Sequence, residues 1–444
     1  MSIDRESWLF GRSGVFKSLR HLMMVVTPSL YMVAIVTAYR WYFIAVAVLF
    51  ILSLLCEWEG SSSWAGIGSL LTAIGLFWCA LALSALWALD PGLTIGALWL
   101  PALYIGLFLC VARWSRERTL VEQTAPFAVL VWAVAGVYLW VYMQFGAIRP
   151  VNEDVDTAFG AGSNLGAMHV LVAMPLLLWR LRVAPTLWVV LTCVVGVGVL
   201  VVSGTRSALL ITPILVLVLA MMWTADTRKH SGYLLRALAV FVALGVVMAT
   251  SLIGVATWER IADLSQYFSD PSTLLLAGEA DYERAITYLE GWNAFVSHPI
   301  TGIGYWNLTA WLEMRYGWGT SSHNILVTLL GEAGLPAALA FTYVIAQFIA
   351  RIRMGMRIDV RTSGRAFCAA LAVAMLGTLL IAFFHQLLDF QVFYMLLGLA
   401  SALPVVPQGL TSLRGFLGAG GRTEVAVRPV VVLSHDPVQR RSAL

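Results

Sequence analysis

The sequence predicts an all-α polytopic membrane protein with about twelve transmembrane helices and one large exterior loop. Three observations predict this class. Of the 444 residues, 60% are hydrophobic and only 12% are charged. Apolar runs of about 18 residues or more recur along the chain, and this is the length that a transmembrane helix requires. The runs are continuous rather than alternating, which excludes a transmembrane barrel and leaves helices as the spanning elements.

The expected spans divide the chain into five parts. A cytoplasmic N-terminal segment, 1–21, precedes helices one to nine within 22–255. A polar, acidic loop with an amphipathic helix occupies 256–322, helices ten to twelve lie within 323–407, and the tail 408–444 is expected to be flexible. The expected spans are 22–38, 41–56, 65–87, 92–112, 125–145, 164–179, 184–202, 207–223, 235–255, 323–350, 366–386 and 391–407.

The basic residues predict which side of the membrane each connection faces. With the N-terminus in the cytoplasm, alternation of the spans places 22 of the 28 Lys and Arg on the cytoplasmic side. Both termini are then cytoplasmic, and 256–322 faces the exterior, which is the periplasm in a Gram-negative cell. The six exceptions are Arg40, Arg149, Arg206, Arg260, Arg284 and Arg315.

The composition also argues against a nucleic-acid partner and against a disulfide framework or zinc site. The net charge of +4 comes from basic residues at helix ends, which is typical of membrane topology and not of a nucleic-acid partner. The five cysteines lie in or beside apolar runs without a CxxC pair, so the sequence indicates neither a disulfide framework nor a zinc site.

Three side chains on the exterior side are candidates for a site at the membrane surface. Arg206 lies in VVSGTRSALL, directly after a very short turn. Arg284 lies in a predicted amphipathic helix, 280–297, on the face that also carries Tyr288; Ala285, Leu289, Trp292 and Phe295 share another face. His323, in SSHNILVTLLGEAGL, opens the expected span 323–350. Plainer interpretations are an interfacial anchor for Arg206, a helix lying on the membrane for 280–297, and a helix cap for His323.

These residue types suit one class of reaction. A neutral imidazole can accept a hydroxyl proton near neutral pH. Two guanidinium groups can hold a diphosphate through paired N–H donors and stabilise its charge as it leaves. The set predicts transfer from a lipid diphosphate to an incoming hydroxyl. The alternative from another class is a transporter or flippase for the lipid-linked glycan, which would need ionisable residues at mid-bilayer. The spans offer few of these apart from His169, which is expected to make a buried polar contact.

The order and context of these residues resemble the O-antigen ligase and O-antigen polymerase superfamily. The resemblance covers about residues 150–400 and is densest over 200–340. It rests on SGTRSALL, YERAITYLEGW, HPITGIGYWN and HNILVTLLGEAGLPAAL, with His298 in the third motif interpreted as structural. Weaker support comes from FGAGSNLGAMHVLVAMPLLL, which contains Asn164, and from HQLLDFQVF, which contains His385 and Asp389.

The resemblance implies an inner-membrane glycosyltransferase of the GT-C kind that uses undecaprenyl diphosphate-linked glycan on the periplasmic side. Arg206 and Arg284 would bind the diphosphate, and His323 would activate the acceptor hydroxyl for attack at the anomeric carbon, with inversion. Neither a metal nor another cofactor is expected; Asp154 and Asp156 form a DxD that can hold a cation, but solvated loop carboxylates are our interpretation. Further residues expected to bind the glycan lipid or to support the site are Asn164, Asn324, Tyr288, His385 and Asp389. For His385 and Asp389, a structural hydrogen bond between the two is the preferred interpretation.

The acceptor distinguishes the ligase from its relatives. In the ligase it is a core sugar on lipid A, in the polymerase it is another lipid-linked repeat, and in some relatives it is a pilin hydroxyl. The single large exterior loop favours the ligase, because the exterior connection 146–163 is short and acidic rather than long and rich in arginine. We therefore expect O-antigen ligation to lipid A-core, with polymerisation of O-antigen or exopolysaccharide as the alternative.

Overall fold

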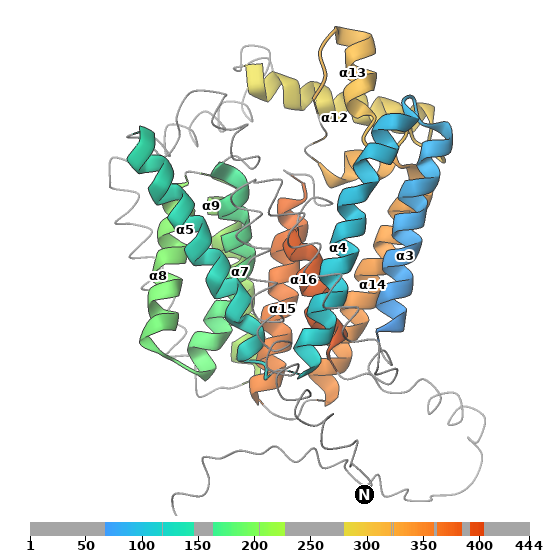
Figure 1. Ribbon diagram of the computed structural model, residues 1–444. Helices are drawn as coiled ribbons and strands as arrows, with labels where there is room; N and C mark the ends of the chain where they lie inside the picture. The colour runs from blue at the N-terminus through green and yellow to red at the C-terminus, as the bar shows by residue number, and fades with distance from the viewer. Residues whose placement is uncertain are drawn as a thin grey trace, which may run out of the picture. The chain divides into compact units, whose positions relative to one another are not determined.

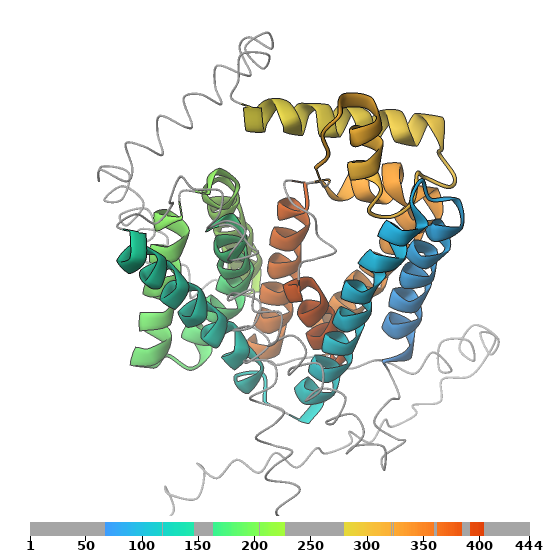
Figure 2. The same ribbon diagram turned by 45° about the horizontal axis from the view of Figure 1, so that its top comes forward.

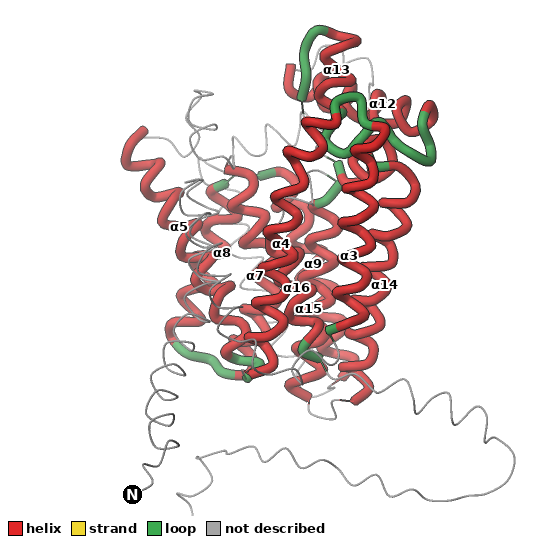
Figure 3. The backbone as a smooth tube through the Cα atoms, turned by 45° about the vertical axis from the view of Figure 1, so that its right-hand side comes forward, coloured by secondary structure: helices red, strands yellow, loops and turns green. Residues whose placement is uncertain are grey.

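The structure is a computed structural model that describes residues 67–117, 119–145, 163–203, 205–226, 279–320, 322, 324–358, 362–383 and 391–403. For some residues within these ranges, including Asn164, Arg206 and Arg284, only the backbone is described. The expected spans 22–38, 41–56 and 235–255 lie outside the described residues, as do His323, the DxD, His385, Asp389 and the tail. The described residues contain helices and no strand, which confirms the all-α class (Figure 3).

Six described helices are long and apolar enough to cross a membrane, and three shorter apolar helices accompany them. Large apolar side chains such as Leu76, Ile95, Leu139 and Leu217 are exposed on their outer faces, as lipid contact requires. The apolar helices are α3 (Gly68–Leu83, continued by the 3₁₀ turn η2, Ser84–Trp87), α4 (Pro91–Glu117), α5 (Ala125–Phe145), α7 (Ser163–Val183), α8 (Leu187–Val202), α9 (Arg206–Asp226), α14 (Gly334–Ile358), α15 (Thr362–Ile381) and α16 (Gln391–Ser401).

Helix α15 joins two groups of helices. One group consists of α5, α7, α8 and α9, and the other of α3, α4, α14 and α16. Helix α15 packs against α7 and α9 on one side and against α14 and α16 on the other (Figures 1 and 2). Buried aromatic side chains, among them Trp179 of α7 and Phe367 of α15, fill the contact with rings 4.9 Å apart.

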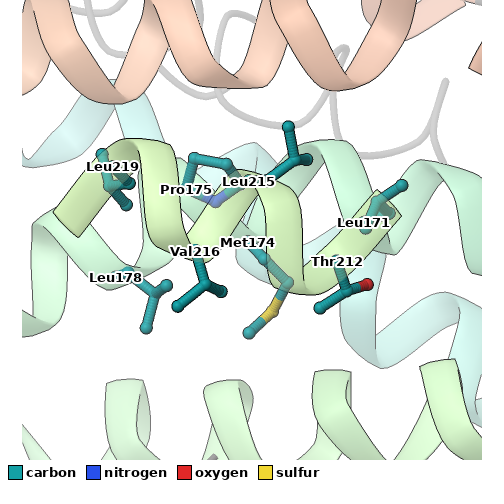
Figure 4. Close-up of a pocket in the computed structure, with 8 residues that line it drawn as sticks. All are labelled: Leu171, Met174, Pro175, Leu178, Thr212, Leu215, Val216 and Leu219. Carbon is teal, nitrogen blue, oxygen red and sulfur yellow. The ribbon is translucent and has the colours of Figure 1, made fainter. Parts of the chain in front are cut away.

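The seam between α7 and α9 is narrow and apolar. Leu171, Met174 and Leu178 of α7 face Leu215 and Leu219 of α9 around a gap of about 10 Å³ (Figure 4). That volume corresponds to roughly one water molecule. The middle of this seam therefore has no room for a sugar.

The expected span 323–350 is not a single helix. Residues Val327–Glu332 form a π-helical turn, η5, and α14 begins only at Gly334, whose φ of +77° lies in the left-handed region. The spanning part is Gly334–Arg357. The apolar run continues across this break, so hydropathy alone predicted a single span.

Helix α16 also differs from the expected span 391–407. The helix has 11 residues, all of them buried. It ends at Ser401 and is enclosed by its neighbours, chiefly α4. An enclosed helix and a lipid-exposed one give the same continuous apolar pattern, which explains the difference.

Contacts at each end of the bundle join connections between helices that the charge pattern assigns to the same side. At one end, here called the inner end, Arg351 donates to Ser69 Oγ at 2.9 Å and to the carbonyl oxygen of Ser401 at 3.2 Å. At the opposite, outer end, the backbone N–H of Tyr305 donates to Ser84 Oγ at 2.9 Å. The connections that were predicted to share a side therefore meet in space.

Candidate active site

A helix at the outer end carries one of the predicted arginines. Helix α12 (Glu279–Ser297) matches the predicted amphipathic helix 280–297 and lies across this end of the bundle (Figures 1 and 2). It packs on the π-turn η5. Gly291 permits the close approach, because a Cβ at that position would overlap the side chain of Val327. The glycine in YLEGW is thus explained by packing.

The two faces of α12 have opposite environments. Thr287, Glu290 and Ala294 are buried against the rest of the protein. Leu289 and Trp292, from the face that the sequence marks as apolar, are 54% and 56% exposed. The helix therefore presents its apolar face outward and packs through the face that includes Gly291.

Glu290 attaches α12 to the short helix α13 (Leu308–Tyr316). Its carboxylate is 3% exposed and accepts hydrogen bonds from Trp311 Nε1 at 2.8 Å, Arg315 Nη1 at 2.8 Å, Tyr316 Oη at 3.0 Å and Asn293 Nδ2 at 3.0 Å. Burial by itself would raise the pKa of Glu290, but these hydrogen bonds and the charge of Arg315 outweigh it, so that its pKa is lowered overall. Glu290 therefore stays ionised and holds α13 in place.

Arg315 is accounted for by the same contacts. Its guanidinium group pairs with Glu290 and lies 4.1 Å from the ring centroid of Trp311. Of the exterior arginines in the described helices, this one has a structural role. Arg206 and Arg284 remain as the candidates for anion binding.

Glu332 organises the turn before α13. Its buried carboxylate accepts hydrogen bonds from the backbone N–H groups of Trp306 at 3.2 Å and Leu308 at 3.1 Å. A carboxylate at the first turn of a helix satisfies free N–H groups and complements the helix dipole. It also supports Trp306, a non-glycine residue with a φ of +68°. The Glu in GEAGLP is therefore a structural capping residue.

The motif HPITGIGYWN connects three segments of the outer end. Its Gly304 N–H donates to the carbonyl oxygen of Glu332 at 2.8 Å. Leu89, in the α3–α4 turn, donates its N–H to the carbonyl oxygen of Ile303 at 3.0 Å, and Thr94 Oγ1 donates to that of Tyr305 at 2.8 Å. The role of the α3–α4 turn in this assembly could not be predicted from the sequence, because the contact joins residues more than 200 positions apart.

His298, at the start of the same motif, contacts the short helix α13. Its ring packs edge-on against Trp311, with centroids 6.3 Å apart. Its carbonyl oxygen accepts a hydrogen bond from the N–H of Gly302 at 2.8 Å.

The segment around position 323 is attached to the outer end of α15. Asn324 Nδ2 donates to the carbonyl oxygen of Phe383 at 3.0 Å, and the N–H of Ile325 donates to that of Ala382 at 2.8 Å. Asn324 Oδ1 accepts from the N–H of Leu326 at 2.7 Å and so caps the turn that follows. The amide of Asn324, predicted to bind the glycan lipid, thus engages protein groups on both sides.

Tyr288 brings α12 to the same point. Its hydroxyl donates to the carbonyl oxygen of Phe383 at 3.4 Å. Arg284 lies one helical turn before Tyr288 in α12. The helix that carries Arg284 and the chain that flanks position 323 are therefore attached to one carbonyl group at the end of α15.

Arg206 and Asn164, which were also predicted to belong to the site, lie in the first turns of helices at the outer end. Arg206 is the first residue of α9, whose opposite end is bonded to the start of α15 through Trp223 Nε1 and the carbonyl oxygen of Ala366 at 3.4 Å. Asn164 is the second residue of α7, whose opposite end is bonded to the same region through Trp179. Both N-termini therefore lie at the end where α15 terminates.

His169 makes the buried polar contact that the sequence predicted. It is 1% exposed, and its Nε2 lies 3.0 Å from Oε1 of Gln391 in α16. The amide of Gln391 donates in turn to the hydroxyl of Tyr104 in α4 at 2.7 Å. This chain links α7, α16 and α4, and it is consistent with a structural role for His169.

Among the described residues, no group of three His, Cys, Asp or Glu side chains is arranged to hold a metal ion.

The comparison with protein families identifies the region. Residues 189–342 match the family described as O-antigen ligase. This part of the chain is similar to an O-antigen ligase domain. That domain extends from the first turn of α8 into α14, and its range includes Arg206, Arg284, His323 and Asn324. It coincides with the part of the chain, 200–340, where the resemblance was expected to be densest. A search of curated proteins gave no match.

Proposed function

We propose that this protein is an inner-membrane glycosyltransferase of the GT-C kind that moves a glycan from undecaprenyl diphosphate to a hydroxyl of lipid A-core at the periplasmic face. The O-antigen ligase domain supports a membrane enzyme that processes glycans. The donor, the acceptor and the compartment belong to the proposal. Our proposed donor site lies at the outer end of the bundle, among Arg206, Arg284 and His323.

The observation that carries the proposal is the shared attachment at Phe383. Tyr288 and Asn324 bind its carbonyl oxygen from two different segments. This places the helix that carries Arg284 and the residue directly after position 323 at one point. A base and an anion-binding group must be held in a fixed relation for transfer, because misplacement of reacting groups by about 1 Å can cost about 100-fold in rate.

In the proposed reaction, His323 accepts the proton of the acceptor hydroxyl as its oxygen attacks the anomeric carbon. The new glycosidic C–O bond forms while the bond to the diphosphate breaks, and the electron pair leaves with the diphosphate oxygen. Arg206 and Arg284 stabilise the charge that develops on that oxygen. Attack from the side opposite the leaving group inverts the anomeric configuration.

Asn164 and Asn324 are proposed to lie beside the glycan lipid. Tyr288 is proposed as a positioning residue, because its described contact is with the protein backbone. His385 and Asp389 complete the proposed set. No metal or other cofactor takes part in this scheme.

The test is a reaction of the purified full chain with undecaprenyl diphosphate-linked glycan and lipid A-core, in the presence and absence of EDTA. Glycan on lipid A-core in both conditions is the expected result. If the only product is a longer lipid-linked glycan, the protein is a polymerase. If no acceptor yields product, with or without added divalent metal, the glycosyltransferase proposal is wrong.

A further inference from the structure

A buried asparagine in the motif HPITGIGYWN bonds to the segment 87–94, which contains the α3–α4 turn and the first turn of α4. The side chain of Asn307 is 0% exposed. Its Oδ1 accepts the backbone N–H of Asp90 at 2.6 Å, and its Nδ2 donates to Thr94 Oγ1 at 2.8 Å. Thr94 Oγ1 donates in turn to the carbonyl oxygen of Tyr305 at 2.8 Å. Hydrogen bonds that are shielded from water therefore attach the motif to a segment more than 200 positions earlier in the chain.

The two glycines of the motif let it fit between this segment and η5. A Cβ at Gly304 would overlap Ala88 of the segment 87–94. A Cβ at Gly302 would overlap the carbonyl group of Glu332 in η5. Both glycines also have a positive φ, which a residue with a side chain rarely adopts. The spacing G-x-G therefore gives the motif one close contact with each neighbour.

The motif is bonded to η5 beside the same asparagine. The carboxylate of Glu332 accepts the backbone N–H groups of Trp306 and Leu308. These two residues flank Asn307 in the chain. The side chain of Asn307 is therefore held by the segment 87–94, and the backbone on both sides of it is held by η5. A change in the hydrogen bonds of Asn307 is consequently expected to move the end of η5.

The turn η5 leads back to the segment around position 323. The backbone N–H of Thr328 donates to the carbonyl oxygen of Asn324 at 3.1 Å. Asn324 is bonded to α15 through the carbonyl oxygen of Phe383. The chain that follows position 323 is thus held at one end by α15 and at the other end by the contacts of Glu332. Hydrogen bonds of this supporting kind keep reacting groups in their productive geometry.

A simpler interpretation is that the hydrogen bonds of the segment 87–94 only stabilise the fold. Another buried threonine offers a comparison. Trp132 Nε1 of α5 donates to Thr192 Oγ1 of α8 at 3.0 Å, and this hydrogen bond also joins two helices. Neither α5 nor α8 carries a residue of the proposed site. If stability were the whole effect, the loss of either threonine hydroxyl group would have the same consequence for glycan transfer.

We propose that the segment 87–94 positions the catalytic segment and that Thr94 and Asn307 are positioning residues. They fix the position of His323 through η5. The segment lies outside the residues 189–342 that match the O-antigen ligase family, so the functional unit extends beyond the match. The inference rests on the proposed glycan transfer. Because His323 acts in the chemical step and the arginines hold the donor, loss of these hydrogen bonds should lower kcat and leave KM unchanged.

The test compares T94V with T94S in the full chain. Valine keeps the shape of the side chain and removes the hydroxyl group, whereas serine keeps the hydroxyl group. At a temperature where every variant is folded, T94V is expected to lower kcat about three- to tenfold with KM unchanged, as one lost buried hydrogen bond would. T94S should stay close to the wild type. The matched control T192V should lower Tm by a similar amount and keep the wild-type kcat.

Hydrogen exchange supplies a readout that does not depend on transfer. The backbone amides of 324–332 should exchange faster in T94V than in the wild type, and T192V should leave their exchange unchanged. Unchanged exchange in T94V would overturn the proposal, as would an unchanged kcat or an equal fall of kcat in T192V. A wild type that transfers no glycan would instead overturn the proposed function, while the exchange rates still decide whether the segment 87–94 holds η5.

If T94V does not fold, W87F gives a second test. This change removes the indole N–H that Trp87 donates to the carbonyl oxygen of Thr301. Trp87 is 40% exposed, and exposed positions tolerate substitution better than buried ones. The control W99F makes the same change at an exposed tryptophan of α4. A lower kcat in W87F than in W99F is expected, and equal values would overturn the proposal.

Discussion

The hydroxyl of Tyr288 and the side-chain amide of Asn324 donate to the same acceptor, the carbonyl oxygen of Phe383, at 3.4 and 3.0 Å. Tyr288 belongs to α12 and Asn324 to the chain that leads into η5. A single carbonyl group at the outer end of α15 therefore relates the helix of Arg284 to the segment of His323.

Replacing Tyr288 by Phe removes one of these two hydrogen bonds and leaves the ring. A neutral hydrogen bond contributes about 0.5–1 kcal/mol, so glycan transfer is expected to slow about two- to fivefold. The measurement is the transfer rate together with Tm. The control Y343F changes a half-exposed tyrosine of α14 away from the site and should leave the rate unchanged. A Y288F protein with the full rate would remove Tyr288 from the positioning role.

His323→Ala is expected to abolish transfer without loss of insertion or folding. Removal of a general base typically lowers a rate by about 100- to 10,000-fold. The measurement is product formation by protein that elutes and unfolds like the wild type. The same change at His298, which packs on Trp311, should act through stability instead. Appreciable transfer by H323A would mean that another group takes the proton.

Arg284→Lys keeps the positive charge and removes the paired N–H donors. We expect transfer to fall about 10- to 100-fold, because one charge-assisted hydrogen bond contributes about 1.5–3 kcal/mol. Arg353→Lys, at an exposed position of the inner end, is the matched control. Equal rates in the two variants would show that charge alone, and not guanidinium geometry, is needed at position 284.

Glu290→Gln is expected to lower the free energy of unfolding by about 1–3 kcal/mol. The ion pair with Arg315 contributes little of this, because the Arg315 side chain is 44% exposed and solvent screens the interaction. The effect should depend on pH. The pKa of Glu290 is lower in the folded protein than in the unfolded chain. The ionised carboxylate therefore stabilises the fold fully above the ordinary carboxyl pKa of about 4.3, and this stabilisation is lost as the pH falls through the lower pKa of the folded protein.

Thermal unfolding at several pH values checks this prediction. The difference in Tm between wild type and E290Q should be largest near neutral pH and should shrink in acid, because protonated Glu290 and Gln are both uncharged. A difference that stays constant from neutral to acid pH would contradict the role of the ionised carboxylate.

Gly302→Ala is expected to cost about 2–5 kcal/mol. The φ of +66° is strained for an L side chain, and the added Cβ would also overlap the carbonyl group of Glu332. Gly317→Ala separates the two effects, because its φ is +74° but nothing lies within 4 Å of the added Cβ. It should cost only about 1–2 kcal/mol. Similar losses of Tm in the two variants would mean that the clash at position 302 is relieved without cost.

Several features could be predicted from the sequence because they depend on local composition. Continuous apolar runs predict spanning helices, since each helix satisfies its own backbone groups wherever it packs. The contacts of Tyr305 with Ser84 and of Arg351 with Ser69 show which connections lie together. The side of the membrane that each connection faces stays a prediction from the asymmetry of Lys and Arg. The motifs that resemble the O-antigen ligase family could be recognised because they are short and contiguous, and the match to residues 189–342 includes them.

Other features were decided only by tertiary structure. The π-turn Val327–Glu332 packs against α12 through Gly291 and Val327, and α14 begins at Gly334 rather than at position 323. The sequence also could not distinguish the enclosed α16 from a lipid-facing span, nor show that Glu290, Glu332 and the α3–α4 turn build the outer end. The hydrophobic pattern predicts whether a segment is removed from water, but it does not predict which other segment it packs against. That choice depends on shape and hydrogen bonding between segments far apart in the chain.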